Sequence, residues 1–325
     1  MPCDSELIQN GCMALVRTCA DLQAGESALV ISDEGNSEIA EAVAQTARQL
    51  GGRVRHAVIP PLRFHGQEPP QDVARQMQQS DVIFALTGMS MAHSKARKQA
   101  SENGARYLSL PDYSMDVLTG EALQADFRAL TDEAARLAEL LTAARFIGIR
   151  SESGTDFSCR VKGRKANPAP GWCWGPCTLA SPPDAEVNIA PLEDSSEGVI
   201  VVDGSIPCPQ IGLLKEPITL KVAGGRVQEI SGRGGKVLEE LFESVGSPKA
   251  RVVAELGIGL NPKARLCGSM LEDEGCRGTV HLGMGSNATI GGANDVPFHL
   301  DHVLRRVTAA ADGVTFMRDG KLMQE

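Results

Sequence analysis

The segment Ser27-Ala-Leu-Val-Ile-Ser32 is short and apolar, which predicts a buried strand. The next five residues, Asp33-Glu-Gly-Asn-Ser37, predict a turn that carries helix-capping side chains. From Glu38 to Leu50 the apolar residues recur at helical spacing, and Gly51-Gly52 ends the pattern. A strand, a turn and a helix in this order form the unit from which a parallel α/β sheet is built.

The same alternation continues along the first half of the chain. Strands are predicted at residues 53–59, 81–87 and 106–110, and helices at residues 90–103 and 131–144. Because strands that are separated by helices join through right-handed crossovers, this order predicts a parallel sheet. We therefore expect an α/β domain with a parallel sheet over residues 1–147.

After residue 147 the pattern changes, since glycine and proline become more frequent and helical spacing nearly disappears. Strands are predicted at 197–203, 218–222 and 226–230, and one helix at 235–245. Ala223-Gly224-Gly225 would join the last two strands as a hairpin. We expect an α+β metal-binding domain over residues 148–325.

The composition argues against several classes of partner. The chain has 325 residues, a net charge of −9 and no run of lysine or arginine, which argues against nucleic acid. No apolar stretch is long enough to span a membrane, and residues 1–10 lack the pattern of a secretory signal. We therefore expect a cytoplasmic protein that binds neither nucleic acid nor membrane.

Side chains that bind divalent metals gather in the last quarter of the chain. They lie in segments that otherwise contain many glycines, and they are Glu255, Glu274, His281, His299 and Asp301. His299 and Asp301 alternate as in a strand, so both would point to one face. Taken singly, Glu255 fits a buried ion pair and His281 fits a core or surface histidine. Together these segments favour a metal site.

Two other motifs carry weaker signals. A basic cluster is either a solvated loop or a site for a substrate carboxylate, and it consists of Arg160, Lys162, Arg164 and Lys165. Thr87-Gly88-Met89-Ser90 follows a predicted strand and opens a predicted helix, as phosphate-binding turns do. It lacks the Gly-x-Gly-x-x-Gly pattern, so no nucleotide site is expected.

The metal-ligand segments resemble those of the aminopeptidase T family of metallopeptidases. The resemblance rests on Glu255-Leu-Gly-Ile-Gly-Leu-Asn-Pro262, on the spacing from Glu274 to His281, and on His299-Leu300-Asp301. Gly154-Thr-Asp-Phe157 and Glu186-Val-Asn-Ile-Ala-Pro191 are similar to two further segments of that family.

This resemblance implies a metal-dependent hydrolase that cleaves an amide or peptide bond with a metal-activated water. Glu255 would bridge two divalent ions (Zn, Co or Mn). His299 and Asp301 would complete one site, and Glu274 and His281 the other. Glu255 and Glu186 are the candidate catalytic residues. The expected substrate is a short peptide or a small molecule, such as an aromatic or cyclic catabolite, and the expected assembly is a homodimer.

A second resemblance gives the alternative. Residues 193–198, 285–292 and 298–306 are similar to the 2,5-dihydroxypyridine 5,6-dioxygenase family, whose members use a single iron(II) on the same fold. These dioxygenases carry a histidine where this chain has Glu255. The aminopeptidases carry a tyrosine shortly after the equivalent of His281, whereas Ser286-Asn-Ala-Thr289 has none.

The ligand types decide between the two expectations. With Glu255, His299 and Asp301, one iron would be held by one histidine and two carboxylates instead of the usual two histidines and one carboxylate. A single iron would also leave Glu274 and His281 without a role. We therefore expect the hydrolase, with the ring-cleaving iron(II) dioxygenase as the alternative.

Overall fold

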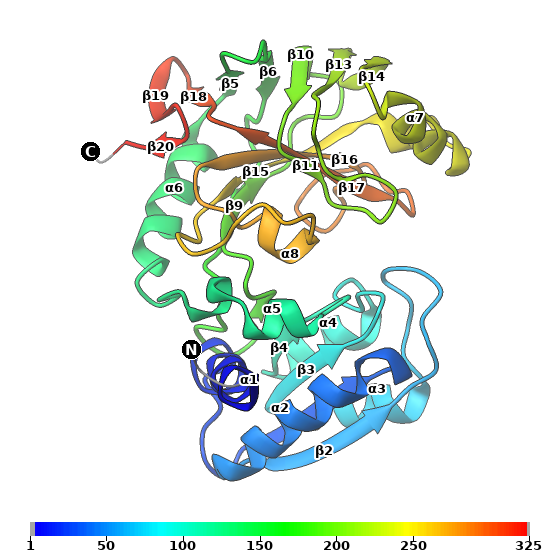
Figure 1. The fold of residues 1–325 in the computed structure, drawn as a ribbon, viewed down its shortest axis with the longest axis vertical. Helices are drawn as coiled ribbons and strands as arrows, with labels where there is room; N and C mark the ends of the chain where they lie inside the picture. The colour runs from blue at the N-terminus through cyan, green and yellow to red at the C-terminus, as the bar shows by residue number, and fades with distance from the viewer. Residues whose placement is uncertain (1–3, 324–325) are drawn as a thin grey trace. The chain divides into compact units, whose positions relative to one another are not determined.

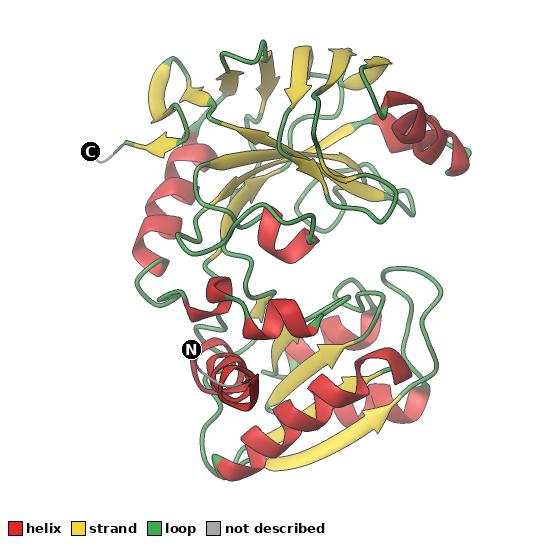
Figure 2. Ribbon diagram, in the orientation of Figure 1, coloured by secondary structure: helices red, strands yellow, loops and turns green. Residues whose placement is uncertain are grey.

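The computed structural model describes residues 4–323, which form two compact units. Unit 1 comprises the residues up to Arg128 together with Gly171–Pro183, and unit 2 comprises Ala129–Pro170 together with the residues from Asp184 onward. Unit 1 consists of strands flanked by helices, whereas unit 2 is mostly strand (Figure 2). Within residues 4–323, no helix combines the length and the apolar character needed to cross a membrane.

Unit 1 is built on one parallel sheet with the strand order β2-β1-β3-β4-β8 (Figure 1). Its strands are β1 (Ser27–Ser32), β2 (Arg53–Val58), β3 (Val82–Leu86), β4 (Arg106–Ser109) and β8 (Leu179–Ala180). Its α-helices are α1 (Asp4–Met13), α2 (Ser37–Gln49), α3 (Gln71–Met77), α4 (Lys95–Glu102) and α5 (Met115–Thr119). It also contains the π-helix η1 (Ala14–Cys19) and the 3-10 helices η2 (Glu34–Asn36) and η3 (Glu121–Gln124). The parallel sheet that the alternating pattern predicts is confirmed.

The helix predicted at residues 90–103 begins later than expected. Ser94 caps α4 by accepting a hydrogen bond from the Arg97 N–H. The Glu68 carboxylate accepts the N–H groups of Lys95 and Ala96 at 2.5 and 3.1 Å. Because an internal carboxylate already fills this helix N-terminus, the turn after β3 is not a phosphate-binding turn.

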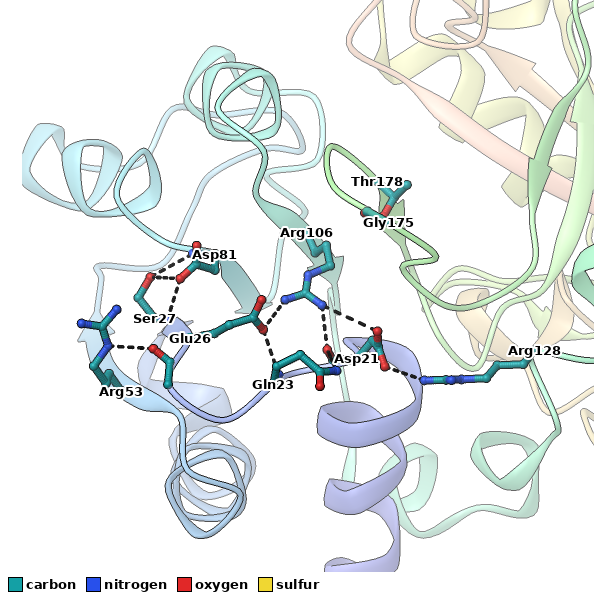
Figure 3. A network of polar contacts seen from close by, with 11 residues as sticks. Asp21, Gln23, Glu26, Ser27, Arg53, Asp81, Arg106, Arg128, Gly175 and Thr178 are labelled. Atoms are coloured by element: carbon teal, nitrogen blue, oxygen red, sulfur yellow. Dashed lines mark hydrogen bonds and ion pairs between the residues drawn. The ribbon is translucent and has the colours of Figure 1, made fainter.

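A network of ion pairs joins the starts of the strands in unit 1 (Figure 3). Arg106, which is buried on β4, pairs with Glu26 and donates to the Asp21 carbonyl at 2.7 Å. The Asp81 carboxylate accepts the N–H and the hydroxyl of Ser27, both at 2.7 Å. These contacts connect the segment that leads into β1 with β3 and β4.

Unit 2 is built on two antiparallel sheets. The eight-stranded sheet has the order β14-β13-β10-β6-β5-β18-β19-β20, and the seven-stranded sheet has the order β12-β11-β17-β16-β15-β9-β7. The sheets pack on each other, with β10 against β17 (Figure 1). The hairpin predicted around Ala223-Gly224-Gly225 is confirmed, since β13 and β14 pair across this turn.

The bounds of the unit 2 elements are as follows. Strands of the eight-stranded sheet are β5 (Phe146–Arg150), β6 (Asp156–Arg160), β10 (Glu197–Val202), β13 (Ile218–Ala223), β14 (Arg226–Ser231), β18 (Thr308–Ala311), β19 (Val314–Arg318) and β20 (Lys321–Leu322). Strands of the seven-stranded sheet are β7 (Asn167–Ala169), β9 (Glu186–Ile189), β11 (Ser205–Ile206), β12 (Gly212–Leu213), β15 (Val253–Gly259), β16 (Thr279–Gly285) and β17 (His299–Arg305). The helices are α6 (Thr131–Ala143), α7 (Gly235–Ser244), α8 (Met270–Asp273) and the 3-10 turn η4 (Pro248–Arg251).

The two units divide the chain differently from the domains expected at residues 1–147 and 148–325. The first division falls at Arg128/Ala129, because α6 packs against β7 and β9 of unit 2. Residues 171–183 then return to unit 1, where β8 adds to the sheet beside β4. A sequence pattern that changes once along the chain does not indicate such a return.

Truncating a buried side chain on β1, an interior strand of the sheet, should destabilise unit 1. Leu29 on β1 is fully buried in a cluster with Ile83 and Tyr107, so Leu29→Ala should cost about 2–5 kcal/mol of unfolding free energy. Both tryptophans, Trp172 and Trp174, belong to unit 1, so tryptophan fluorescence during urea unfolding reports on this unit.

The matched control is Leu213→Ala, which removes the same atoms from a half-exposed position on β12 of unit 2. Its fluorescence midpoint should equal that of the unchanged protein. Equal midpoints for the two variants would contradict the assignment of Leu29 to the core.

Candidate metal centre

Three neighbouring strands of the seven-stranded sheet, β15, β16 and β17, carry four of the five predicted metal ligands, Glu274 follows α8, and the next strand, β9, carries Glu186. The strand register places Glu255 on β15 opposite Gly283 on β16, and Gly283 opposite Asp301 on β17. The next row places Asn188 on β9 opposite Gly257, and Gly257 opposite His281. Because residues two apart along a strand point to the same face, these side chains share one face of the sheet.

Two glycines leave the space into which the ligands point. A Cβ on Gly283 would lie 2.8 Å from the Nε2 of His299 and 2.9 Å from the Oδ1 of Asp301. A Cβ on Gly257 would lie 1.9 Å from the Nε2 of His281. A side chain at either position would therefore displace a candidate ligand, which explains the many glycines in these segments.

The first group of candidate ligands contains Glu255, His299 and Asp301. The His299 Nε2 lies 3.2 Å from the Oε2 of Glu255 and 3.4 Å from the Oδ2 of Asp301. One ligand atom from each of the three lies within 4.8 Å of the others. Glu255 and Asp301 are buried, whereas His299 is about one-third exposed (35% of its side chain), so the group is open on the His299 side.

The backbone selects the tautomer of His299. Its Nδ1 lies 2.9 Å from the carbonyl oxygen of Ser286, and a carbonyl can only accept a hydrogen bond. Nδ1 therefore carries a proton, so Nε2, which faces Glu255 and Asp301, is the nitrogen that would give its lone pair to a metal ion. This arrangement is the usual one for a metal-binding histidine.

The second group contains Glu186, Glu255 and His281. The His281 Nε2 lies 3.0 Å from the Oε2 of Glu186 and 3.9 Å from the Oε1 of Glu255. The side-chain amide of Asn188 donates to the Oε1 of Glu186 at 2.7 Å. Glu255 thus belongs to both groups, one through each of its carboxylate oxygens.

The predicted ligand Glu274 lies next to these groups without belonging to either. It interacts electrostatically with Asp301 and His281, but the closest carboxylate to His281 is that of Glu186. Sequence reasoning did not identify Asp184, which is buried and adjoins Glu186 and Glu255. The alternation Asp184-x-Glu186-x-Asn188 is the signal that could have identified it, because Asp184 precedes β9 by two residues and continues the spacing that puts Glu186 and Asn188 on one face of the strand.

The charges of this site suit a divalent cation. The Oδ1 of Asp184 and the Oε1 of Glu274 are buried without a hydrogen-bond partner. Burial raises the pKa of both carboxyls well above the usual range, and nearby carboxylates add to the shift, first Glu186 for Asp184 and Asp301 for Glu274. Buried carboxylates are costly unless a cation neutralises them, so the donor set fits a metal ion.

The buried carboxylates also shift the pKa values of the two histidines, His281 and His299. Burial lowers the pKa of His281 and His299, but neighbouring carboxylates offset it, with Glu186 dominant for His281 and Asp301 for His299. Both pKa values therefore lie well above the usual range. Positive charge is favoured at this face of the sheet, whether a proton or a metal ion supplies it.

The comparison with protein families shows the family of the chain. The model of the 2,5-dihydroxypyridine 5,6-dioxygenase family matches residues 10–324. The chain belongs to this family. A curated relative from Pseudomonas putida strain KT2440, named 2,5-dihydroxypyridine 5,6-dioxygenase, is 28% identical over 244 residues, which cover 71% of this chain and 67% of the relative.

Two solved structures share the fold of this family member. The dioxygenase structure from Pseudomonas putida has a TM-score of 0.86 at 21% identity, covering 100% of this chain and 99% of that one. AmpT from Thermus thermophilus has a TM-score of 0.73 at 15% identity, covering 99% of this chain and 100% of that one. At these identities the likeness concerns the fold alone.

The expectation of an aminopeptidase-like metallohydrolase is wrong. The family match and the curated relative both support the alternative, a dioxygenase, whereas the likeness to AmpT is distant. The error has a physical cause, since carboxylates and imidazoles bind hydrolytic and redox-active metals alike. The two resemblances seen in the sequence correspond to the two structural neighbours. The dioxygenase resemblance, which was the alternative, is the one that the family match supports.

Adding a methyl group at either glycine should remove metal binding while the sheet stays folded. Gly257→Ala would push against His281, and Gly283→Ala would push against His299 and Asp301. Each variant should bind Co(II) at least about 10-fold more weakly in isothermal titration, as expected when ligands are displaced.

The control is Gly148→Ala, on strand β5 of the other sheet, where the nearest atom to a new Cβ is 4.0 Å away. It should bind Co(II) like the unchanged protein. Normal Co(II) affinity in Gly283→Ala would show that His299 and Asp301 do not meet at a common ion.

Proposed function

We propose that this chain is an iron(II)-dependent dioxygenase that opens the ring of a dihydroxylated pyridine. The proposal rests on the group formed by Glu255, His299 and Asp301 in a chain that the dioxygenase family model matches from residue 10 to residue 324. The substrate class comes from the relative in Pseudomonas putida, whose name specifies 2,5-dihydroxypyridine and the bond between ring positions 5 and 6.

Glu255, His299 and Asp301 would hold the iron. Two carboxylates balance the charge of a divalent ion, and the imidazole Nε2 lies between them at 3.2 and 3.4 Å from their oxygens. Iron(II), when bound, would let a spin-paired organic substrate react with dioxygen, and the electrons that reduce the dioxygen come from the substrate. The exposed side of His299 is the side from which a planar ring can approach.

Glu186 and His281 would orient Glu255 in this arrangement. His281 is almost fully buried, so its Nε2 faces Glu186 and Glu255 and not the solvent. Asn188 in turn holds the second oxygen of Glu186. This chain of contacts keeps one oxygen of Glu255 directed at His281 and the other at His299.

The reaction should depend on oxygen and on one iron per chain. Protein purified without oxygen and loaded with Fe(II) should consume one O2 for each 2,5-dihydroxypyridine. Mass spectrometry should find both atoms of ¹⁸O2 in the product. Turnover without oxygen, with label arriving from H2¹⁸O alone, would rule out the dioxygenase.

Variants at Glu255 test the ligand set. Glu255→Ala removes a direct ligand and should lower turnover by at least about 100-fold. Loss of a residue that only contacts a metal ligand lowers activity by up to about that factor, so loss of the ligand itself should cost at least as much. Glu255→His supplies the more usual two-histidine-one-carboxylate set and should keep iron in stoichiometric amount.

The control is Glu229→Ala, which removes an exposed carboxylate paired with Lys221 and should leave activity unchanged. Iron binding unaffected by Glu255→Ala would contradict the assignment.

A further inference from the structure

The carbonyl that orients His299 belongs to a loop whose position is set elsewhere in unit 2. Residues 286–298 connect β16 to β17, and the Ser286 carbonyl at the start of this loop accepts the Nδ1–H of His299 at 2.9 Å. The direction of the His299 ring therefore depends on where the loop holds this carbonyl. Several residues of the loop are exposed, so packing against the sheet alone does not fix it.

Within the loop, two asparagines hold Ser286 in place. Asn287 is fully buried, and its side-chain oxygen accepts the Asn294 N–H at 2.8 Å while its own N–H donates to the Asn294 carbonyl at 3.0 Å. The Asn294 side chain donates to the Gly285 carbonyl at 2.6 Å. The residues on both sides of Ser286 are thus tied to Asn294. The Ser286 N–H donates to the Phe298 carbonyl at 2.8 Å, and the peptide that carries the Ser286 carbonyl is held on its other side by the Asn287 N–H.

Glu193, in the connection from β9 to β10, ties this loop to the rest of unit 2. Its Oε1 accepts the side-chain N–H of Asn287 at 3.1 Å and the backbone N–H of Ala293 at 2.7 Å. Arg164 donates to both carboxylate oxygens of Glu193 at 2.8 and 2.7 Å and also to the carbonyl of Gly291. The Glu193 carboxylate therefore joins Asn287 and Ala293 of the loop to the guanidinium of Arg164.

These contacts keep Glu193 charged. Burial raises its pKa, but the hydrogen bonds from Ala293 and Asn287 and the charge of Arg164 more than offset this, so its pKa lies below the usual value. The side chains of Arg164 and Glu193 are only 14% and 28% exposed. A paired, largely buried carboxylate of this kind imposes a geometry on its partners more effectively than a surface ion pair does. Arg164 is consequently not available to bind a substrate carboxylate.

We propose that Glu193 is a positioning residue for the metal centre, acting through Asn287 and the Ser286 carbonyl on the ring of His299. The proposal rests on the proposed function only in that His299 is taken as a metal ligand. Loss of Glu193 releases the loop, the carbonyl moves away from Nδ1, and the Nε2 lone pair is no longer held towards Glu255 and Asp301. The result is weaker metal binding and an altered ligand geometry.

The test uses Co(II) as the probe, because its visible absorption bands report ligand geometry without any turnover. Glu193→Ala should bind Co(II) about 10-fold more weakly than the unchanged protein and show shifted bands, as expected for loss of a contact behind a ligand. Glu193→Gln has the same shape and retains an acceptor oxygen for Ala293 or Asn287, so it should recover part of both losses. It also carries the test if Glu193→Ala does not fold.

The matched control is Glu26→Ala in unit 1. Glu26 is also 28% exposed and also pairs with a largely buried arginine, Arg106 (Figure 3). Its removal should lower the melting temperature to a similar extent as removal of Glu193 does, since both leave a guanidinium without its carboxylate. The Co(II) affinity and spectrum of Glu26→Ala should nevertheless equal those of the unchanged protein.

Two outcomes would overturn the positioning role. One is a folded Glu193→Ala protein with unchanged Co(II) affinity and spectrum, or, where that variant does not fold, a Glu193→Gln protein with both unchanged. The other is a Glu26→Ala protein that changes the spectrum as much as the Glu193 variants do, because the effect would then follow from general destabilisation. Failure of the dioxygenase proposal looks different: the unchanged protein would lack oxygen-dependent turnover, while the Co(II) spectra would still separate Glu193→Ala from Glu26→Ala.

Discussion

Repulsion among buried carboxylates is the constraint on which the metal centre depends. Five of them adjoin one face of the seven-stranded sheet: Asp184, Glu186, Glu255, Glu274 and Asp301. The two histidines beside them contribute at most two positive charges. A fold that buries five carboxyl groups together must neutralise them with protons or with a metal ion, because an uncompensated buried carboxylate costs several kcal/mol. The same requirement explains why the contacts of Glu186 and Glu255 run to histidines, which change charge readily.

The strand register determines where the charged side chains of this site lie relative to one another. Side chains directly opposite each other on neighbouring strands lie only about 5 Å apart, which leaves no room for an ion between them. A glycine at the middle position of a row removes one side chain and opens that room. Gly283 does so between Glu255 and Asp301, and Gly257 does so beside His281. The glycines are therefore as much a part of the centre as the ligands.

Local patterns in the sequence predict the strands and the ligand types, whereas long-range pairing decides what the ligands do. The strand at 27–32 and the hairpin around residues 223–225 depend on neighbouring residues, and both are confirmed. The partner of His281 is Glu186, which precedes it by almost one hundred residues and reaches it only because β9 pairs with β15 and β15 with β16. The return of residues 171–183 to unit 1 is a long-range event of the same kind.

The choice between hydrolysis and oxygen chemistry shows why ligand types alone mislead. Both structural neighbours share the fold at TM-scores of 0.86 and 0.73, so the fold does not select the reaction. A hydrolase stabilises the oxyanion of a tetrahedral intermediate with hydrogen-bond donors, with a metal ion or with both. The chain has two tyrosines, Tyr107 and Tyr113, and both belong to unit 1, while residues 286–289 supply only a serine, an asparagine, an alanine and a threonine. In this loop the buried Asn287 is engaged with Asn294 and Glu193, which makes the loop a support for His299. This segment therefore holds a candidate ligand in place and directs no phenol at a substrate, so the reaction has to be read from the family match and not from the ligand types.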